Sequence, residues 1–499
     1  MSIKSFYISQ FLRSLAEAMI SPFLSVYLLF LGATKALIGL ASTLPDTISL
    51  FSQLFWGSLS ESTFKKKIFI IFGGIAWALM WIPIALVKDP LLLVSLLTLQ
   101  ALLSSASAPA WTALLIRLTP SYKITYVQGN LNAIANFATF IGTMIAGLIL
   151  NTFGFIPFIF YLIAFLGIMS RVPFFNFHEP ITPKSDGSLK SILKRTFNFS
   201  RIKNEKEFIK LIIVITFLNF SVSLAAPFLS VYVVTGLKGN LIDITILSLL
   251  SAIATLMFSR PWGVVVEKIG RKLVMLACII PAALIPFVYA IAPNIEWIYF
   301  YNFIGAMAWA GFNLAVFAYL ASILPKEKLD SSIGFYNLFT GLGSSAGPFV
   351  GGILSEFLGL KNLFFLSTFL RLLTIILIER LEEKSSYKPR FSGLTFEFLG
   401  LGYRIENFVS AYSLVMIETL RQSSFLLNFK NHFKTSNAPR IGNLSTYSLV
   451  TIKFHFQIFL KILWHQGVKT LRQSLLNLKN HFKKISVFLH KCSRALRKK

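Results

Sequence analysis

Long apolar segments alternate with short polar ones along the first 381 residues. A membrane-spanning α-helix needs about 20 consecutive, mostly apolar residues. Twelve segments meet this requirement, and we expect transmembrane helices at 5–30, 37–59, 68–88, 91–117, 128–153, 155–175, 208–235, 241–266, 273–292, 297–323, 333–358 and 360–381. The pattern predicts an all-α membrane protein. Its expected parts are six-helix bundles at 1–175 and 208–381, a linker at 176–207 and a tail at 382–499.

The two predicted bundles repeat each other. Ser-Pro-Phe-Leu-Ser-Val-Tyr at 21–27 recurs as Ala-Pro-Phe-Leu-Ser-Val-Tyr at 226–232, 205 residues later. Chance similarity among apolar helices is the alternative, but the offset stays at 205 or 206 for landmarks between residues 21 and 154. A parallel duplication of this kind is typical of secondary transporters, whose binding site lies between the repeats. Further repeated landmarks are Pro120 and Pro325, Gly129 and Gly334, Asn132 and Asn337, Gly142 and Gly347, Gly147 and Gly352, and Gly154 and Gly359.

Composition excludes the soluble classes. The mean hydropathy is +0.69, 55% of the residues are hydrophobic and only 14% are charged. A soluble chain could not cover so much apolar surface with so few charges, so we exclude a soluble enzyme, a secreted disulfide scaffold and a disordered protein. The two cysteines lie far apart, and the six histidines lie outside the apolar segments. No metal site or cofactor is therefore expected.

The distribution of basic residues predicts the orientation in the membrane. Lysines and arginines are concentrated in the even-numbered loops, for example at 65–67 and 268–272. Because positive residues stay on the cytoplasmic side, we expect a multi-pass protein of the cell membrane with both termini and the linker in the cytoplasm.

The loop after the eighth segment carries a motif. Gly263, Glu267, Lys268, Gly270 and Arg271 form a glycine, three residues, an acid, a base, and then a glycine followed by bases. This resembles the signature of the major facilitator superfamily, with glutamate in place of the family's aspartate. In that family the loop holds the cytoplasmic side closed when the transporter faces outward, so the resemblance implies a gating role for these residues.

The first repeat carries a degraded copy of this motif. Gly57 and Glu61 are retained, but Ser62 and Phe64 replace the base and the glycine. Arg117 lies where the family often has an acid, which suggests a charge exchange and a pair between Glu61 and Arg117. An arginine that faces lipid headgroups is the alternative.

Residues in two other predicted helices bear on the resemblance to this family. Gly343, Gly347, Pro348 and Gly351 in the eleventh segment resemble the glycine–proline motif that antiporters of the family carry in helix 5. Because the helix differs, we interpret these residues as packing residues. Leu97 replaces an arginine that proton-linked members often have in helix 4, which weakens the case for a standard proton-driven drug exporter.

Charged residues inside the predicted helices are costly, and such residues mark transport pathways. Arg13 and Glu17 are four residues apart on one helix face, and Asp46 follows Pro45 in the second segment. Arg371, in the last segment, is interpreted as structural. In the family fold helices 1, 4, 7 and 10 line the cavity. The candidates for substrate binding or proton coupling are therefore Arg13, Glu17, Asp46, Gln100, Asn219, Asn302 and Asn313, and their mostly apolar surroundings favour an amphiphilic or weakly charged substrate.

The tail at 382–499 is strongly basic and has an amphipathic pattern. It holds 20 basic and 5 acidic residues, a net charge of +15 out of +28 for the chain. Apolar residues alternate at spacings of three and four from Leu471 to Leu496, beside a basic face. This pattern predicts an amphipathic helix on anionic lipid headgroups. A partner helix is the alternative, and no nucleic acid is expected.

Together these features predict a secondary transporter that moves a small-molecule substrate by alternating access, with protons as the expected coupling ion. The alternatives are an uncoupled facilitator and a membrane receptor or scaffold on a transporter fold. No nucleotide-binding loop is present in the sequence, so ATP drive from this chain is not supported, and we do not expect an enzyme.

Overall fold

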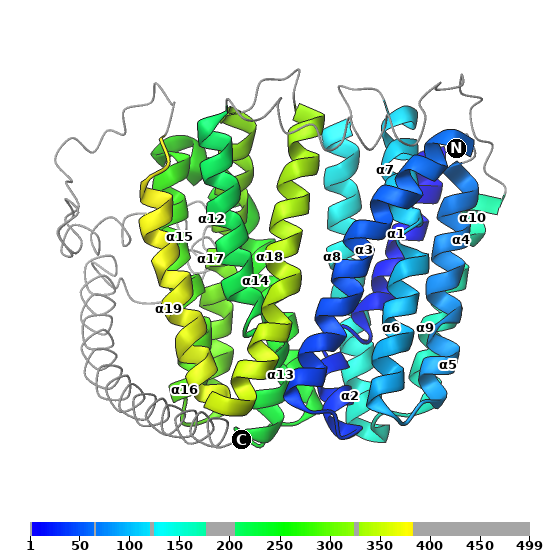
Figure 1. Ribbon diagram of the computed structural model, residues 1–499, viewed down its shortest axis with the longest axis horizontal. Coiled ribbons are helices and arrows are strands. Elements are labelled where there is room, and N and C mark those ends of the chain that lie inside the picture. The colour runs from blue at the N-terminus through cyan, green and yellow to red at the C-terminus, as the bar shows by residue number, and fades with distance from the viewer. Residues whose placement is uncertain (1, 64–65, 120–123, 176–204, 324–328, 383–499) are drawn as a thin grey trace, which may run out of the picture. The chain divides into compact units, whose positions relative to one another are not determined.

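The computed structural model describes residues 2–63, 66–119, 124–175, 205–323 and 329–382. Helices account for nearly all of these residues, and no strand occurs among them (Figure 1). Most of the linker and all but the first residue of the predicted tail lie outside this range, so the expectations about the tail are untested. The first half contains α1 (Ser2–Ala18), α2 (Leu24–Phe30), α3 (Lys35–Thr63), α4 (Lys66–Leu79), α5 (Trp81–Leu86), α6 (Pro90–Ser104), α7 (Ser107–Leu118), α8 (Ile124–Phe153), α9 (Pro157–Met169) and α10 (Val172–Phe175).

The second half repeats this order. Its helices are α12 (Lys206–Ser223), α13 (Ala226–Thr235), α14 (Leu241–Ile269), α15 (Arg271–Ala283), α16 (Ile285–Ile291), α17 (Ile295–Ile323), α18 (Leu329–Leu358) and α19 (Leu360–Glu379). Within the described residues, nine helical stretches are long and apolar enough to cross a membrane. The all-helical membrane fold is thus confirmed, and the count of twelve crossings stays a prediction.

Several predicted segments are broken into two helices. The segment 5–30 contains α1 and α2, and the segment 208–235 contains α12 and α13. Pro22 and Pro227 lie at these two breaks, 205 residues apart. Proline has no N–H group and its ring clashes with the preceding turn, so a helix cannot pass through it undisturbed. The repeated heptapeptide therefore breaks both helices at equivalent points.

Packing within the halves follows the same duplication. α1 packs against α8, and α12 packs against α18 in the equivalent way. The contact of α3 with α6 likewise corresponds to that of α14 with α17. Gly142 explains part of this: a Cβ atom there would overlap the Leu15 carbonyl oxygen, and the equivalent Gly347 would bring a Cβ atom 2.7 Å from the Phe220 carbonyl oxygen.

The halves meet along two seams, α3 with α18 and α8 with α14. We call the end where the chain passes through 64–65, 120–123, 176–204 and 324–328 the linker end, and the opposite end the short-turn end. Close contacts between the halves occur at the short-turn end. A Cβ atom on Gly39 would lie 2.9 Å from the Pro348 carbonyl carbon, and one on Gly147 would overlap the Thr245 side chain.

Hydrogen bonds also join the halves at the short-turn end. The Lys35 Nζ atom donates to the Ser355 carbonyl oxygen at 3.3 Å, and the Ala36 N–H group donates to Glu356 Oε1 at 3.0 Å. Because Lys35 starts α3 and Ser355 lies in the last turn of α18, each helix end is capped by a side chain of the other half. This reciprocal cap holds the short-turn end closed.

Candidate functional site

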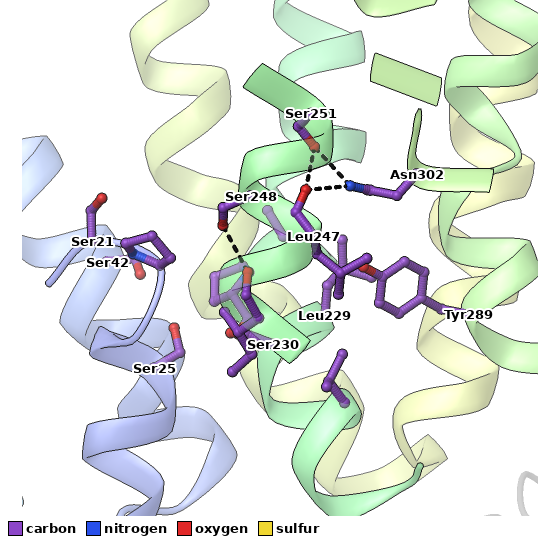
Figure 2. Close-up of a pocket in the computed structure, with 15 residues that line it drawn as sticks. Ser21, Ser25, Ser42, Leu229, Ser230, Leu247, Ser248, Ser251, Tyr289 and Asn302 are labelled. Carbon is purple, nitrogen blue, oxygen red and sulfur yellow. Dashed lines mark hydrogen bonds between the residues drawn. The ribbon is translucent and has the colours of Figure 1, made fainter. Parts of the chain in front are cut away.

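A cavity of about 350 Å³ lies between the two halves, beside the helix breaks (Figure 2). Its walls come from the start of α2, from α3, α13 and α14, and from one side chain each of α16 and α17. None of the described residues that line it is charged. The reciprocal cap and the glycine contacts join the halves on its short-turn side.

The repeated heptapeptide supplies both walls. Ser21, Pro22 and Ser25 line the cavity from the first half, and Pro227 and Ser230 line it from the second. Ser25 and Ser230 are 205 residues apart and therefore equivalent in the duplication. Ser42 on α3 and Ser248 on α14 form a second such pair, 206 residues apart. Figure 2 shows the serines of the two halves on opposite sides of the cavity.

Among the described residues, the second half has a polar corner that the first half lacks. The Asn302 side-chain NH₂ group donates to the Leu247 carbonyl oxygen at 2.8 Å and to Ser251 Oγ at 2.7 Å. Tyr289 is 5% exposed and points its hydroxyl group toward Leu229 and Leu247 (Figure 2). At the equivalent positions the first half has Leu97 and Ile84, so the site is asymmetric in its hydrogen-bonding groups.

The two carboxylates predicted for coupling lie one helical turn from the cavity. The Ser21 N–H group donates to the Glu17 carbonyl oxygen at 3.1 Å, which places Glu17 one turn before a lining serine. Asp46 follows Ser42 by one turn on α3 and is exposed. Both carboxylates thus lie on the linker-end side of the cavity.

Arg13 contacts both Glu17 and an aromatic ring. Its Nε atom lies 3.4 Å from Glu17 Oε2. Its guanidinium carbon lies 3.5 Å from the centre of the Trp77 ring, within the range of a cation–π interaction. The Glu17 side chain is 58% exposed, whereas that of Arg13 is 22% exposed. Arg13 is therefore held against its own bundle while Glu17 remains accessible.

Polar side chains continue from the cavity toward the linker end. On α3, Ser42 is followed at helical spacing by Asp46, Ser49 and Gln53, and Gln53 Nε2 donates to Ser49 Oγ at 3.1 Å. Residues three and four apart lie on one helix face. On α14 the corresponding stripe consists of Ser248, Ser251, Thr255 and Ser259, and three of the four positions match at an offset of 206, the exception being Asp46 and Ser251. They form two equivalent polar tracks.

The other predicted site residues lie away from this cavity. Gln100 is buried and donates to the Trp77 carbonyl oxygen at 2.8 Å. Asn219 donates to the Thr340 carbonyl oxygen at 3.3 Å and so links α12 to α18. Asn313 is exposed on α17. Of the four amide residues, only Asn302 lines the cavity.

The predicted gating glycines contact their own halves. A Cβ atom on Gly57 would meet only Pro109, at 3.6 Å, and one on Gly263 would meet only Leu314, at 3.7 Å. Pro109 and Leu314 are themselves equivalent, 205 residues apart. In the described residues, then, the other half does not approach these two glycines.

The rest of the gating motif is partly described. Gly270 joins α14 to α15 with φ of 105°, a conformation that favours glycine. Arg271 begins α15 and Glu267 is exposed. The side chains of Glu61, Arg117 and Lys268 lie outside the described part of the structure, so the predicted pair between Glu61 and Arg117 stays a prediction.

The glycines of α18 face two partners. Gly343, Gly347 and Gly351 lie against α12, where added Cβ atoms would meet Thr216, Phe220 and Leu224. Pro348 instead faces Gly39 of α3 in the first half. This geometry agrees with close helix packing, which glycines permit because they have no side chain.

Sequence reasoning missed the serines of the cavity and Tyr289. A serine has no cost inside a helix that would single it out, because its hydroxyl group can donate to the carbonyl four residues earlier. A signal was nevertheless present. Prolines that interrupt equivalent helices of two repeats point to a transporter's binding site, and both copies of the heptapeptide contain such a proline.

Comparison with known proteins agrees with this architecture. The profile of the Major Facilitator Superfamily matches residues 6–260 and 211–460. The multi-drug resistance efflux pump PmrA of Streptococcus pneumoniae is 29% identical over 212 residues, 39% of this chain and 51% of PmrA, so the match spans about half of that relative. The multidrug resistance protein MdtG of a Rahnella species is 22% identical over 372 residues, 72% of this chain and 88% of MdtG.

Solved structures show the same fold. The nucleoside transporter NupG aligns with a TM-score of 0.65 at 14% identity, over 76% of this chain and 100% of that chain. A bacterial homologue of the lysosomal transporter Spinster, in an inward-facing and occupied conformation, aligns with a TM-score of 0.60 at 11% identity, over 78% and 98%. The profile match covers both repeats, and the helices that it covers form the duplicated bundle described above. The chain therefore belongs to the Major Facilitator Superfamily.

Proposed function

We propose that this chain moves a small amphiphilic solute across the membrane by alternating access through the cavity between its halves. The observation that carries the proposal is that both copies of the heptapeptide line one cavity, at the breaks in equivalent helices. Relatives named as multidrug efflux proteins support an amphiphilic substrate. The positive-inside distribution supports a cytoplasmic linker end. In that orientation the polar tracks lead from the cavity toward the cytoplasm.

We further propose that protons drive transport through Glu17, with Asp46 as the second carboxylate. In this scheme a polar group of the solute engages Arg13, Glu17 loses its partner, and Glu17 takes up a proton. The support is that Arg13 and Glu17 are in contact, that Glu17 is accessible, and that both carboxylates lie one turn from the cavity.

Counterflow in proteoliposomes tests transport. We choose uridine, chloramphenicol and ethidium as labelled solutes, because they span neutral and cationic chemistry. Ser42→Trp and Ser248→Trp place a large ring in the cavity from either half, and each should abolish the counterflow seen with the unaltered protein. Ser95→Trp is the matched control, since Ser95 is exposed on α6 and does not line the cavity. Undiminished counterflow in the Ser42 and Ser248 variants would exclude this cavity as the route.

A pH gradient tests the coupling. Glu17→Gln resembles the protonated side chain and should abolish gradient-driven uptake while solute exchange persists. Asp46→Asn is compared under the same conditions. Loss of gradient-driven uptake in Asp46→Asn alone would assign coupling to Asp46. Full uptake in both variants would leave a facilitator, or another driving ion, as the better description.

A further inference from the structure

We propose that the polar corner formed by Asn302, Ser251 and Tyr289 selects uncharged ligands that carry a hydrogen-bond donor, an O–H or N–H group, in preference to organic cations. The inference rests on the proposed function, because it names the substrate class of the same cavity. The inference is drawn from the donors and acceptors in the cavity that form no hydrogen bond within the protein.

The hydrogens of Asn302 and Ser251 are already used within the protein. Both hydrogens of the Asn302 amide have acceptors, at Leu247 and Ser251. The Ser251 hydroxyl group in turn donates to the Leu247 carbonyl oxygen at 3.0 Å. An amide whose NH₂ group is fully used can offer a ligand only its oxygen. Asn302 Oδ1 can therefore accept a hydrogen bond from a ligand.

The neighbouring serines behave in the same way. Ser248 Oγ donates to the Ile244 carbonyl oxygen at 3.0 Å, and Ser230 Oγ donates to the Pro227 carbonyl oxygen at 3.4 Å. A hydroxyl has one hydrogen and two lone pairs, so these serines also present acceptors to the cavity. Asn302, Ser248 and Ser230 thus present acceptors, which match a ligand that donates.

Charge disfavours an organic cation in this cavity. No described residue of the lining is charged, and a cation removed from water needs a counter-charge close to it. Glu17 lies one turn away and already contacts Arg13 at 3.4 Å. Asp46 also lies one turn from the residues that line the cavity. An uncharged donor avoids this desolvation penalty and satisfies Asn302.

The duplication provides a built-in comparison. At the positions of Asn302 and Tyr289 the first half has Leu97 and Ile84. Asn302→Leu therefore gives the second half the residue of the first, and Tyr289→Phe removes a single hydroxyl group. Asn151→Leu and Tyr161→Phe are matched controls, because both residues are exposed and neither lines the cavity.

The experiment measures binding to the purified full-length protein. The probes are 4,4′-dihydroxybiphenyl, which has two donors, its dimethyl ether, which has none, and tetraphenylphosphonium, a cation without donors. We expect the diol to bind at least about fivefold more tightly than either other probe, the size of one net hydrogen bond. Asn302→Leu should bring the ratio of diol to ether close to one. Tyr289→Phe removes a group that can serve either probe and should leave the diol favoured, and the controls should keep the ratio.

Equal binding of diol and ether, tighter binding of tetraphenylphosphonium, or no binding of the diol would overturn the inference. Thermal unfolding of each variant checks that it folds. If Asn302→Leu does not, the ratio of diol to ether in the unaltered protein decides the outcome. The two proposals fail separately: absent counterflow refutes transport and leaves the binding ratio measurable, whereas a ratio of one in the unaltered protein refutes donor selection and leaves counterflow intact.

Discussion

Arg371 illustrates how a single charged residue is accommodated inside the apolar bundle. It is 2% exposed, and its guanidinium group donates to the Ala282 carbonyl oxygen at 3.3 Å and to the Val222 carbonyl oxygen at 3.2 Å. These two carbonyls lie next to the breaks between α15 and α16 and between α12 and α13. Since a broken helix leaves carbonyl oxygens without partners, Arg371 satisfies groups that the breaks expose.

Replacing Arg371 by methionine should destabilise the protein. The Ala282 carbonyl oxygen would lose its donor and the Val222 carbonyl oxygen would keep only the Ala225 N–H group. We expect a cost of about 1–3 kcal/mol in the free energy of unfolding. The measurement is thermal unfolding in detergent, with Lys361→Met as the control because Lys361 is exposed on the same helix. If the Arg371→Met protein unfolded at the same temperature as the unaltered protein, this structural role would be contradicted.

For these individual residues, the sequence identified the charged residues near the cavity and Asn302, and it missed the serines and Tyr289. Glu17 and Asp46 could be found because a carboxylate inside an apolar segment is costly and rare. Ser25, Ser230 and Tyr289 could not, because such residues occur throughout membrane helices. Which of Gln100, Asn219 and Asn302 faces a cavity depends on helix rotation, which the sequence pattern alone does not give.

Among the helices, glycine pairs determine how closely the two halves approach. Gly142 and Gly347 face helices of their own halves, whereas Gly147 and Gly352 face the other half, near Thr245 and Lys35. The sequence shows these glycines as repeats, but it does not show which pair belongs to which contact. The helix breaks were likewise hidden inside continuous apolar segments, although Pro22 and Pro227 were their physical cause.

Gly39→Val should force the short-turn end apart. A Cβ atom there would lie 2.9 Å from the Pro348 carbonyl carbon. Because the atoms it meets belong to the backbone of α18 and cannot rotate away as a side chain could, α3 and α18 must move apart. Phe153 and Trp297 are both exposed and lie in different halves. Spin labels at these two positions should be farther apart in the variant than in the unaltered protein, as measured by double electron–electron resonance. Gly129→Val makes the same change where nothing lies within 4 Å, and it should leave the distance unchanged. A Gly39→Val protein with the original distance would mean that this contact is not limiting.

For the whole molecule, the central property is which end is closed. The short-turn end is held by the reciprocal cap of α3 and α18, while the predicted gating glycines near the linker end contact only their own halves. The sequence could predict the two halves and their repeats. It could not predict the state, because a transporter uses one set of residues for both of its conformations.

Glu356→Gln and Lys35→Met should each weaken the closed short-turn end. A charge at a helix terminus contributes about 0.3–1 kcal/mol, so each change should raise the population that is open at this end by about twofold to fivefold. The same pair of spin labels measures this population, and Glu296→Gln is the control because Glu296 is exposed at the start of α17. Identical distance distributions in all variants would show that the cap does not bias the equilibrium.

The shortness of α2 and α13 has an electrical consequence. These helices have seven and ten residues, and at 1.5 Å per residue they are about 10 and 15 Å long. Membrane voltage falls mainly across the layer that water does not enter, and the full drop is worth about 2.3 kcal/mol per elementary charge for each 100 mV. In the transport proposed above, with water in the linker end, this thin layer carries most of the voltage. In that scheme an uncharged ligand crosses it without electrical work, so the membrane potential acts on the coupled proton and not on the ligand itself.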